Sequence, residues 1–137
     1  MKETMIAGLS HKNALTVTEA LTVPNVSPDF TAFSDMPPVF ASAFMIAFFE
    51  ATCIDLMRAH LDDSEHSVGI GFDLTHLAAT PVGMEVRCEV ILTECERGKL
   101  SFKVEAWDEK DLIGTGIHKR AIIKKDKFME RVQAKLQ

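Results

Sequence analysis

The segment FMIAFFEATCI, residues 44–54, constrains the fold of this chain most strongly, because it is almost wholly apolar and yet contains one carboxylate, Glu50. The apolar run begins at residue 39, and apolar side chains then recur at spacings of three, four and seven residues. This spacing predicts a helix over residues 39–60. A helix that is apolar around most of its circumference is normally buried. Its expected buried stripe comprises Phe40, Phe44, Ala47, Ala51, Ile54 and Leu61.

The segments on either side of this helix predict β-strands. Residues 14–23 are rich in Thr, Val and Leu and predict a first strand, which a proline-containing loop joins to the helix. Four further strands are expected at 67–77, 84–94, 100–108 and 112–124. A short amphipathic helix should end the chain, with Asp126 as its N-cap and with Phe128, Val132 and Leu136 four residues apart.

A buried helix needs cover on most sides, and a twisted antiparallel sheet of five strands can give that cover by curling around it. We therefore predict an α+β hot-dog fold, formed by a single domain over residues 1–137. One such sheet leaves an edge and part of the helix open, so the expected state is a homodimer, which could pair further into a dimer of dimers.

Charge and cysteine usage exclude several kinds of protein. A net charge of −5 argues against nucleic-acid binding, although Lys119, Arg120, Lys124, Lys125 and Lys127 form a basic group near the end of the chain. That basic group is either a solvated face or a contact for phosphates. The cysteines and histidines lack metal-ligand spacing, so no metal is expected. With neither a signal peptide nor a membrane span in the sequence, we expect a soluble, cytoplasmic protein.

Two ionisable side chains fall on apolar faces. In the strand expected at 67–77, Ile70, Phe72, Leu74 and His76 share one face, so His76 continues an apolar row. A lone histidine there would normally be a core residue. Together with Glu50 in the apolar helix, however, it indicates an acid–base pair in a water-poor site.

Ser42 is the third candidate, with N-capping of the helix as the alternative. It precedes Glu50 by eight residues, or ~12 Å along a helix at 1.5 Å per residue. The two side chains therefore cannot meet within one straight helix. Either Ser42 lies in the turn before the helix or the site draws on two subunits, and we favour a site at the subunit interface.

Three segments in this order resemble the fluoroacetyl-CoA thioesterase family of the hot-dog superfamily: VFASAFMIAFFEATCI (39–54), THLAATPVGMEV (75–86) and GTGIHKRAII (114–123). The resemblance implies a homodimeric acyl-CoA thioesterase without a cofactor other than the CoA of its substrate. Its catalytic residues would be Ser42, Glu50 and His76. A backbone N–H of Gly69 would hold the thioester carbonyl, and Arg120 would lie near the site.

The sequence departs from the family at two positions. Ser42 stands where the fluoroacetyl-selective member has threonine, and Met36 replaces an aromatic residue near the lid of the site, whereas Phe33 is kept. These differences bear on selectivity for the fluoroacetyl group and leave thioester hydrolysis as the expected reaction. With Phe40, the side chains Phe33 and Met36 favour a small acyl pocket.

In the expected mechanism, Glu50 acts as nucleophile or as base toward water, and His76 donates a proton to the departing sulfur or orients the water. Ser42 would hold Glu50 or the substrate carbonyl. Two other functions compete with hydrolysis. One is an acyl-thioester hydratase or dehydratase, which also uses a carboxylate and a histidine. The other is a non-catalytic acyl-CoA-binding module.

Overall fold

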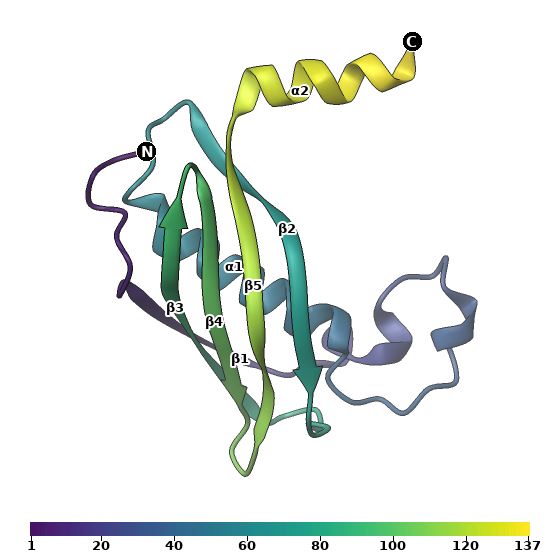
Figure 1. Cartoon of the computed structure of the whole chain (residues 1–137). Coiled ribbons are helices and arrows are strands. Elements are labelled where there is room, and N and C mark those ends of the chain that lie inside the picture. The colour runs from purple at the N-terminus through teal and green to yellow at the C-terminus, as the bar shows by residue number, and fades with distance from the viewer.

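Five strands form one antiparallel sheet in the computed structural model, which describes all 137 residues. They are β1 (Ser10–Thr16), β2 (Glu65–His76), β3 (Glu85–Glu96), β4 (Lys99–Trp107) and β5 (Leu112–Lys124). Their order across the sheet is β1-β3-β4-β5-β2, so β1 and β2 are the two edge strands. The sheet is strongly twisted, and helix α1 (Ser42–Arg58) crosses one of its faces (Figure 1). The α+β class and the five-stranded antiparallel sheet are thus confirmed.

Helix α1 packs on the sheet through a different face from the one predicted. Its buried side chains recur at spacings of three and four residues, whereas Ala47 and Ala51, which the predicted stripe includes, are exposed. The stripe was wrong because this helix is apolar on nearly every side, so that spacing alone cannot identify the face toward the sheet. The buried residues are Met45, Phe48, Phe49, Thr52, Cys53, Leu56 and Met57.

The first strand begins and ends earlier than predicted. Strand β1 ends at Thr16, and the part of the predicted strand beyond it forms two short 3-10 turns, Glu19–Leu21 and Val23–Asn25. Pro24, directly after the predicted strand, lies in the second turn, where its missing N–H is tolerated. The beginning of β1 escapes prediction because two of its inward-facing residues, His11 and Asn13, are polar.

Helix α2 (Lys125–Gln133) follows β5 directly and extends past the edge strand β2 (Figure 1). The prediction that Asp126 caps this helix was wrong: the N-cap is Lys124, without a side-chain hydrogen bond, and Asp126 lies in the first turn. The backbone N–H of Lys125 instead donates to the carbonyl of Ser64, 3.0 Å away. None of the residues of α2 is buried.

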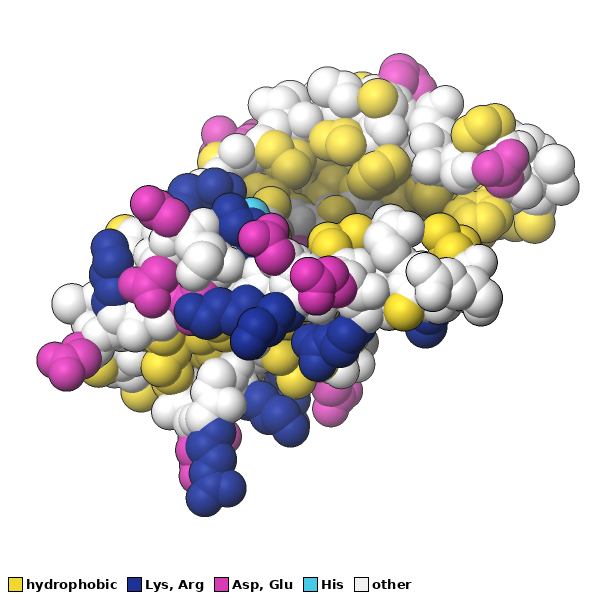
Figure 2. Space-filling model, turned by 90° about the horizontal axis from the view of Figure 1, so that it is seen from above, with side chains coloured by type: hydrophobic (Ala, Val, Ile, Leu, Met, Phe, Trp, Pro, Cys, Tyr) yellow, Lys and Arg dark blue, Asp and Glu magenta, His cyan; other side chains and the backbone are white.

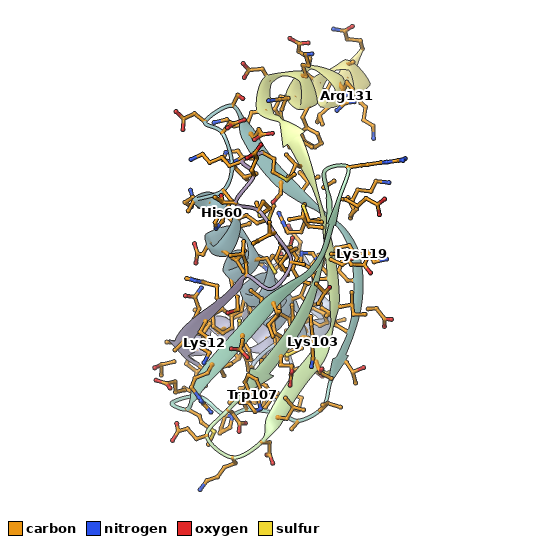
Figure 3. All side chains as sticks on the ribbon, turned by 60° about the vertical axis from the view of Figure 1, so that its left-hand side comes forward. Lys12, His60, Lys103, Trp107, Lys119 and Arg131 are labelled. Carbon is orange, nitrogen blue, oxygen red and sulfur yellow. The ribbon has the colours of Figure 1, made fainter.

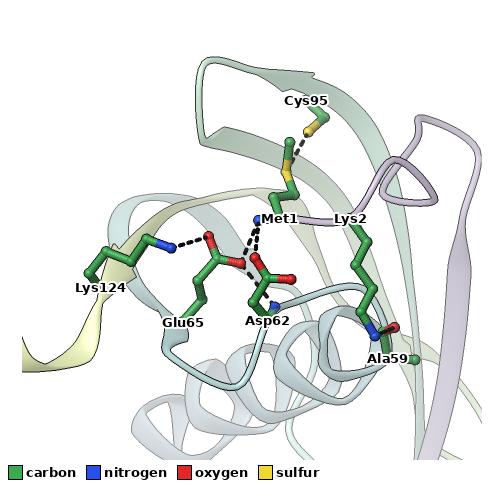
Figure 4. A network of polar contacts seen from close by, with 7 residues as sticks. All are labelled: Met1, Lys2, Ala59, Asp62, Glu65, Cys95 and Lys124. Atoms are coloured by element: carbon green, nitrogen blue, oxygen red, sulfur yellow. Dashed lines mark hydrogen bonds and ion pairs between the residues drawn. The ribbon is translucent and has the colours of Figure 1, made fainter.

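A polar network ties the start of the chain to the region where α2 begins (Figure 4). The α-amino group of Met1 contacts the carboxylates of Asp62 and Glu65, and Lys124 lies 3.7 Å from the second oxygen of Glu65. These contacts fix the first residue of β2 against the last residue of β5. Neither α1 nor α2 has the length and apolar run that a membrane crossing needs.

The two faces of the sheet differ in character. Lys103 and Lys119 point away from α1 (Figure 3), whereas their neighbours Phe102 and His118 are fully buried. The basic group of the sequence therefore does not form one surface, because Lys119 and Arg120 lie on opposite faces of β5.

Candidate active site

Ser42 and His76 meet at one end of the molecule, where α1 begins and β2 ends. The Oγ atom of Ser42 lies 2.6 Å from Nδ1 of His76, which is hydrogen-bonding distance. They open onto a surface depression of about 390 Å³ whose other lining residues are all apolar. Those residues are Val23, Val39, Phe40, Leu77, Ala78 and Ala79.

The second ring nitrogen of His76 is unusual. Nε2 is buried and has no hydrogen-bond partner in the chain, and an unsatisfied buried polar atom is costly. Burial lowers the pKa of His76 below its usual value, because it disfavours the charged imidazolium, and the backbone of Ala78 partly opposes this shift. When Ser42 donates to Nδ1, the proton of the neutral ring is on Nε2.

Glu50 lies in a separate cluster farther along α1. Nη1 of Arg120 donates to Oε2 of Glu50 at 2.8 Å. The guanidinium side chain is only 3% exposed, whereas the Glu50 side chain is 32% exposed. A charge-assisted hydrogen bond of this kind orients the carboxylate while leaving part of it accessible.

Arg120 itself is held by β2 and by a neighbour on its own strand. Its Nε donates to the hydroxyl of Ser67 at 2.8 Å, and Nη2 donates to the Ser67 carbonyl at 3.0 Å. Nη1 is also 3.1 Å from Nε2 of His118. Sequence reasoning missed Ser67 and His118. Alternation on β5 could have identified His118, because it lies two residues before Arg120 and therefore on the same face.

Gly69 faces the carboxylate of Glu50 at close range. The β2–β5 register skips a residue between Gly69 and Gly71, so Ile70 does not follow the simple alternation predicted for this strand. A Cβ atom on Gly69 would lie 2.9 Å from Oε2 of Glu50, 3.1 Å from Phe72 and 3.3 Å from His118. Only glycine fits there without displacing its neighbours.

Of the three remaining predicted site residues, one lines the Ser42–His76 depression. Phe40 lines it and is fully buried. Phe33 and Met36 lie in the loop before α1, where Met36 is 45% exposed and Phe33 contacts Phe30 edge to face at 6.0 Å. Neither loop side chain lines the depression within one chain. Within one chain, therefore, the predicted residues form two groups, and Glu50 has no hydrogen bond to Ser42 or His76.

A larger apolar groove lies between α1, β2, the end of β5 and α2. It has a volume of about 480 Å³, and Arg58, His66 and Lys125 stand among its mainly apolar lining residues. Ser67, which accepts a hydrogen bond from Arg120, also lines it, so the groove adjoins the Glu50 cluster. Figure 2, seen from the end where α2 lies, shows hydrophobic side chains gathered in a hollow with lysine and arginine side chains nearby.

Comparisons with known proteins agree with this architecture. A family model described as fluoroacetyl-CoA-specific thioesterase matches residues 17–126. A fluoroacetyl-CoA thioesterase from Streptantibioticus cattleyicolor is 36% identical over 135 residues, which cover 98% of this chain and 97% of the relative. A solved structure of a fluoroacetyl-CoA thioesterase superposes with a TM-score of 0.94 at 35% identity, covering 97% of this chain and 98% of the other.

A hot-dog-like protein from Thermanaerovibrio acidaminovorans shares the fold, with a TM-score of 0.81 at 20% identity over 96% of this chain and 93% of the other. The sequence resemblance is thereby confirmed over nearly the whole chain. The chain belongs to the fluoroacetyl-CoA-specific thioesterase family, a family of thioester hydrolases.

Proposed function

We propose that this protein is a homodimeric acyl-CoA thioesterase, in which each active site combines Ser42 and His76 of one subunit with Glu50 of the partner subunit. The observation that carries this proposal is the hydrogen-bonded Ser42–His76 pair, which has no hydrogen bond to a carboxylate of its own chain. A carboxylate supplied by a second copy would complete this pair. It would also bring together Ser42 and Glu50, which lie eight residues apart on α1, or ~12 Å at 1.5 Å per residue.

The surface around β2 supports association of two copies. β2 is an edge strand, and such strands readily pair with a strand of another chain. Beside this edge, Ile70 and Phe72 are each 50% exposed, and α1 presents the exposed small side chains of Ala47 and Ala51. Exposed apolar side chains beside an unpaired sheet edge fit a self-complementary interface with two-fold symmetry.

In the proposed reaction, Glu50 acts as base toward a water molecule, whose oxygen forms a bond to the thioester carbonyl carbon. The water proton moves to the carboxylate, and collapse of the tetrahedral intermediate breaks the C–S bond. The proton then reaches the departing sulfur through the His76 imidazole, giving the free acid and the CoA thiol. The lowered pKa of His76 suits this role, because the neutral ring can accept and donate a proton.

The oxyanion that forms on the carbonyl needs hydrogen-bond donors. The skip in register at Gly69–Gly71 interrupts the regular ladder beside Glu50, and backbone N–H groups there are the proposed donors. Loss of one such donor typically costs ~3 kcal/mol of transition-state stabilisation. The absence of a side chain on Gly69 leaves room for the Glu50 carboxylate beside these donors.

The acyl group would occupy the depression at Ser42 and His76. Its lining by Val23, Val39, Phe40 and Leu77 fits a short apolar acyl chain rather than a charged one. Phe33 and Met36, from the loop before α1, are the proposed lid.

The CoA portion would lie in the groove between α1, β2 and α2. Its apolar floor suits the pantetheine arm, and the cations Arg58 and Lys125 suit the phosphates. The groove adjoins the Glu50 cluster through Ser67, so a bound CoA could extend from it toward the reacting carbonyl.

Thiol release from a panel of acyl-CoAs, from acetyl to long-chain and including fluoroacetyl-CoA, tests the proposal. We expect hydrolysis of short acyl-CoAs by the wild type, and a rate about 10²–10⁴-fold lower in Glu50→Gln, the usual range for loss of a general base. Binding of acyl-CoA without turnover would instead indicate a binding module. Turnover of an enoyl-CoA without thiol release would indicate a hydratase.

A further inference from the structure

His118 has contacts that restrict it to one chemical state. Its side chain is completely buried on β5 and stacks on the ring of Phe72, with ring centroids 4.5 Å apart and an angle of 22° between the planes. Nδ1 lies 2.9 Å from the carbonyl oxygen of Gly71, and Nε2 lies 3.1 Å from Nη1 of Arg120. Both ring nitrogens therefore have a partner.

The polarity of these partners assigns the proton on the ring. A carbonyl oxygen only accepts, so Nδ1 must carry the hydrogen and donate to Gly71. A guanidinium only donates, so Nε2 must be unprotonated and accept from Arg120. The two contacts thus hold His118 as the neutral imidazole with its hydrogen on Nδ1. Burial also lowers the pKa of His118, which favours the same neutral form.

The bond between His118 and Arg120 involves the same nitrogen that binds Glu50. Nη1 carries two hydrogens, one directed at Glu50 and one at His118. Nε donates to the hydroxyl of Ser67 and Nη2 to its carbonyl, so each of the three guanidinium nitrogens has a partner supplied by the protein. Removing the acceptor nitrogen of His118 would leave one N–H of Nη1 buried without a hydrogen-bond partner, and the guanidinium could then rotate.

Besides Glu50, His118 is the side chain that contacts Nη1 of Arg120. Glu50 and the thiol of Cys53 approach from α1, β4 presents Phe102, and β2 presents Gly69, Gly71 and Phe72. Arg120 itself is the other charged group near the ring. The acceptor for the second hydrogen of Nη1 is therefore His118 alone among these side chains.

We propose that His118 is a positioning residue: as a neutral hydrogen-bond acceptor it fixes Arg120, and through Arg120 it fixes the carboxylate of Glu50 for reaction. This inference rests on the proposed thioesterase function. His118 does not touch the substrate in this arrangement. Its effect should therefore appear in kcat, which depends on the placement of Glu50, more than in KM.

Two substitutions separate the two bonds of the ring. In His118→Gln the side-chain carbonyl can replace Nε2 as acceptor for Arg120. In His118→Asn the shorter amide can replace only Nδ1 as donor to Gly71. We expect the kcat of His118→Gln to stay within a few-fold of the wild-type value. The kcat of His118→Asn should fall about ten- to a hundred-fold with KM nearly unchanged, as for a misplaced catalytic group.

Thermal unfolding of both variants and ¹⁵N NMR of the imidazole in the wild type complete the experiment. We expect the NMR spectrum to show the neutral tautomer with hydrogen on Nδ1. An Asn variant as active as the wild type, equal losses in both variants, or the opposite tautomer would overturn the role of His118 while leaving hydrolysis established. A wild type that hydrolyses no thioester would instead overturn the proposed function, and the positioning role with it.

Discussion

The hydroxyl of Ser42 lies 2.6 Å from Nδ1 of His76 although 34 residues separate them in the chain. The contact joins the first residue of α1 to the last residue of β2. Glu50, eight residues later on the same helix, points instead to Arg120. In the proposed dimer, a second copy brings these two groups, which are separate within one chain, to one thioester.

If each active site takes Glu50 from one subunit and His76 from the other, two inactive variants should complement each other. Glu50→Gln lacks one group and His76→Gln lacks the other, so homodimers of either should be inactive. A heterodimer would contain one site with both native residues and one site with neither. After unfolding and refolding an equimolar mixture, random pairing makes half of the dimers heterodimers, and about one quarter of the wild-type activity should return.

Mixing Glu50→Gln with a Glu50→Gln, His76→Gln double variant is the matched control, because it cannot restore a site. Thiol release measures the activity in each mixture, and size-exclusion chromatography confirms that dimers are present. A mixture of the two single variants that stays inactive, despite proven heterodimers, would place the whole site within one subunit.

Gly69 and Gly71 form a matched pair for testing the space beside Glu50. A Cβ on Gly69 would lie 2.9 Å from Oε2 of Glu50, whereas a Cβ on Gly71 would meet only the Lys119 side chain at 3.5 Å or more. We expect Gly69→Ala to lower kcat about ten-fold or more by displacing the carboxylate from Arg120. Gly71→Ala should stay close to the wild type. Similar rates in both variants would show that Glu50 tolerates the displacement.

The sequence predicts the elements of this fold better than it predicts their faces. Strand β5 has the bounds expected from its pattern, Leu112–Lys124, and β2, β3 and β4 differ from prediction by only one or two residues at each end. The face of α1 toward the sheet could not be predicted, because Ala47 and Ala51 are as apolar as the residues that are buried. That choice depends on the sheet, which forms from distant parts of the chain.

The candidate site shows the same limit. Alternation correctly placed Phe72, Leu74 and His76 opposite the inward-facing residues of β5, because period two is a local property. It failed at Ile70, because the skipped register there is not visible in the spacing of apolar residues. The bond from His118 to Arg120 also escaped prediction, since it depends on how a side chain turns after β2 and β5 pair.

Stability should fall as the pH falls below the usual pKa of histidine, about 6.5. Burial lowers the pKa values of both His76 and His118 in the folded chain. Between the unfolded and folded pKa values the unfolded chain binds more protons, so acid favours unfolding in that range. Urea unfolding at pH 7.5, 6.5 and 5.5 should show this decrease.

The His118→Gln variant should show a smaller decrease over the same range, because one of the two buried imidazoles is absent. The lowered pKa values of Glu65 and Asp108 act in a separate, more acidic range, since the usual pKa values of carboxyls lie near ~4. Unchanged stability from pH 7.5 to 5.5 in the wild type would show that these imidazoles titrate in the folded state as they do in the unfolded chain.

The groove between α1, β2 and α2 predicts a difference between two substrates that share an acyl group. Acyl-CoA carries phosphates that can reach Arg58 and Lys125, whereas acyl-pantetheine has none. Removing one cation that lines the groove should cost about 1 kcal/mol of binding, or about five-fold in KM. We therefore expect Arg58→Gln and Lys125→Gln to raise KM for acyl-CoA and to leave KM for acyl-pantetheine unchanged.

Lys103→Gln removes a cation from the opposite face of the sheet and serves as the control for net charge. Added salt should raise KM for acyl-CoA in the wild type and have less effect in the Arg58 and Lys125 variants, because screening acts on the same ion pairs. An equal rise in KM for both substrates would show that these side chains shape the groove rather than bind phosphate. No change for either would place the CoA phosphates elsewhere on the surface.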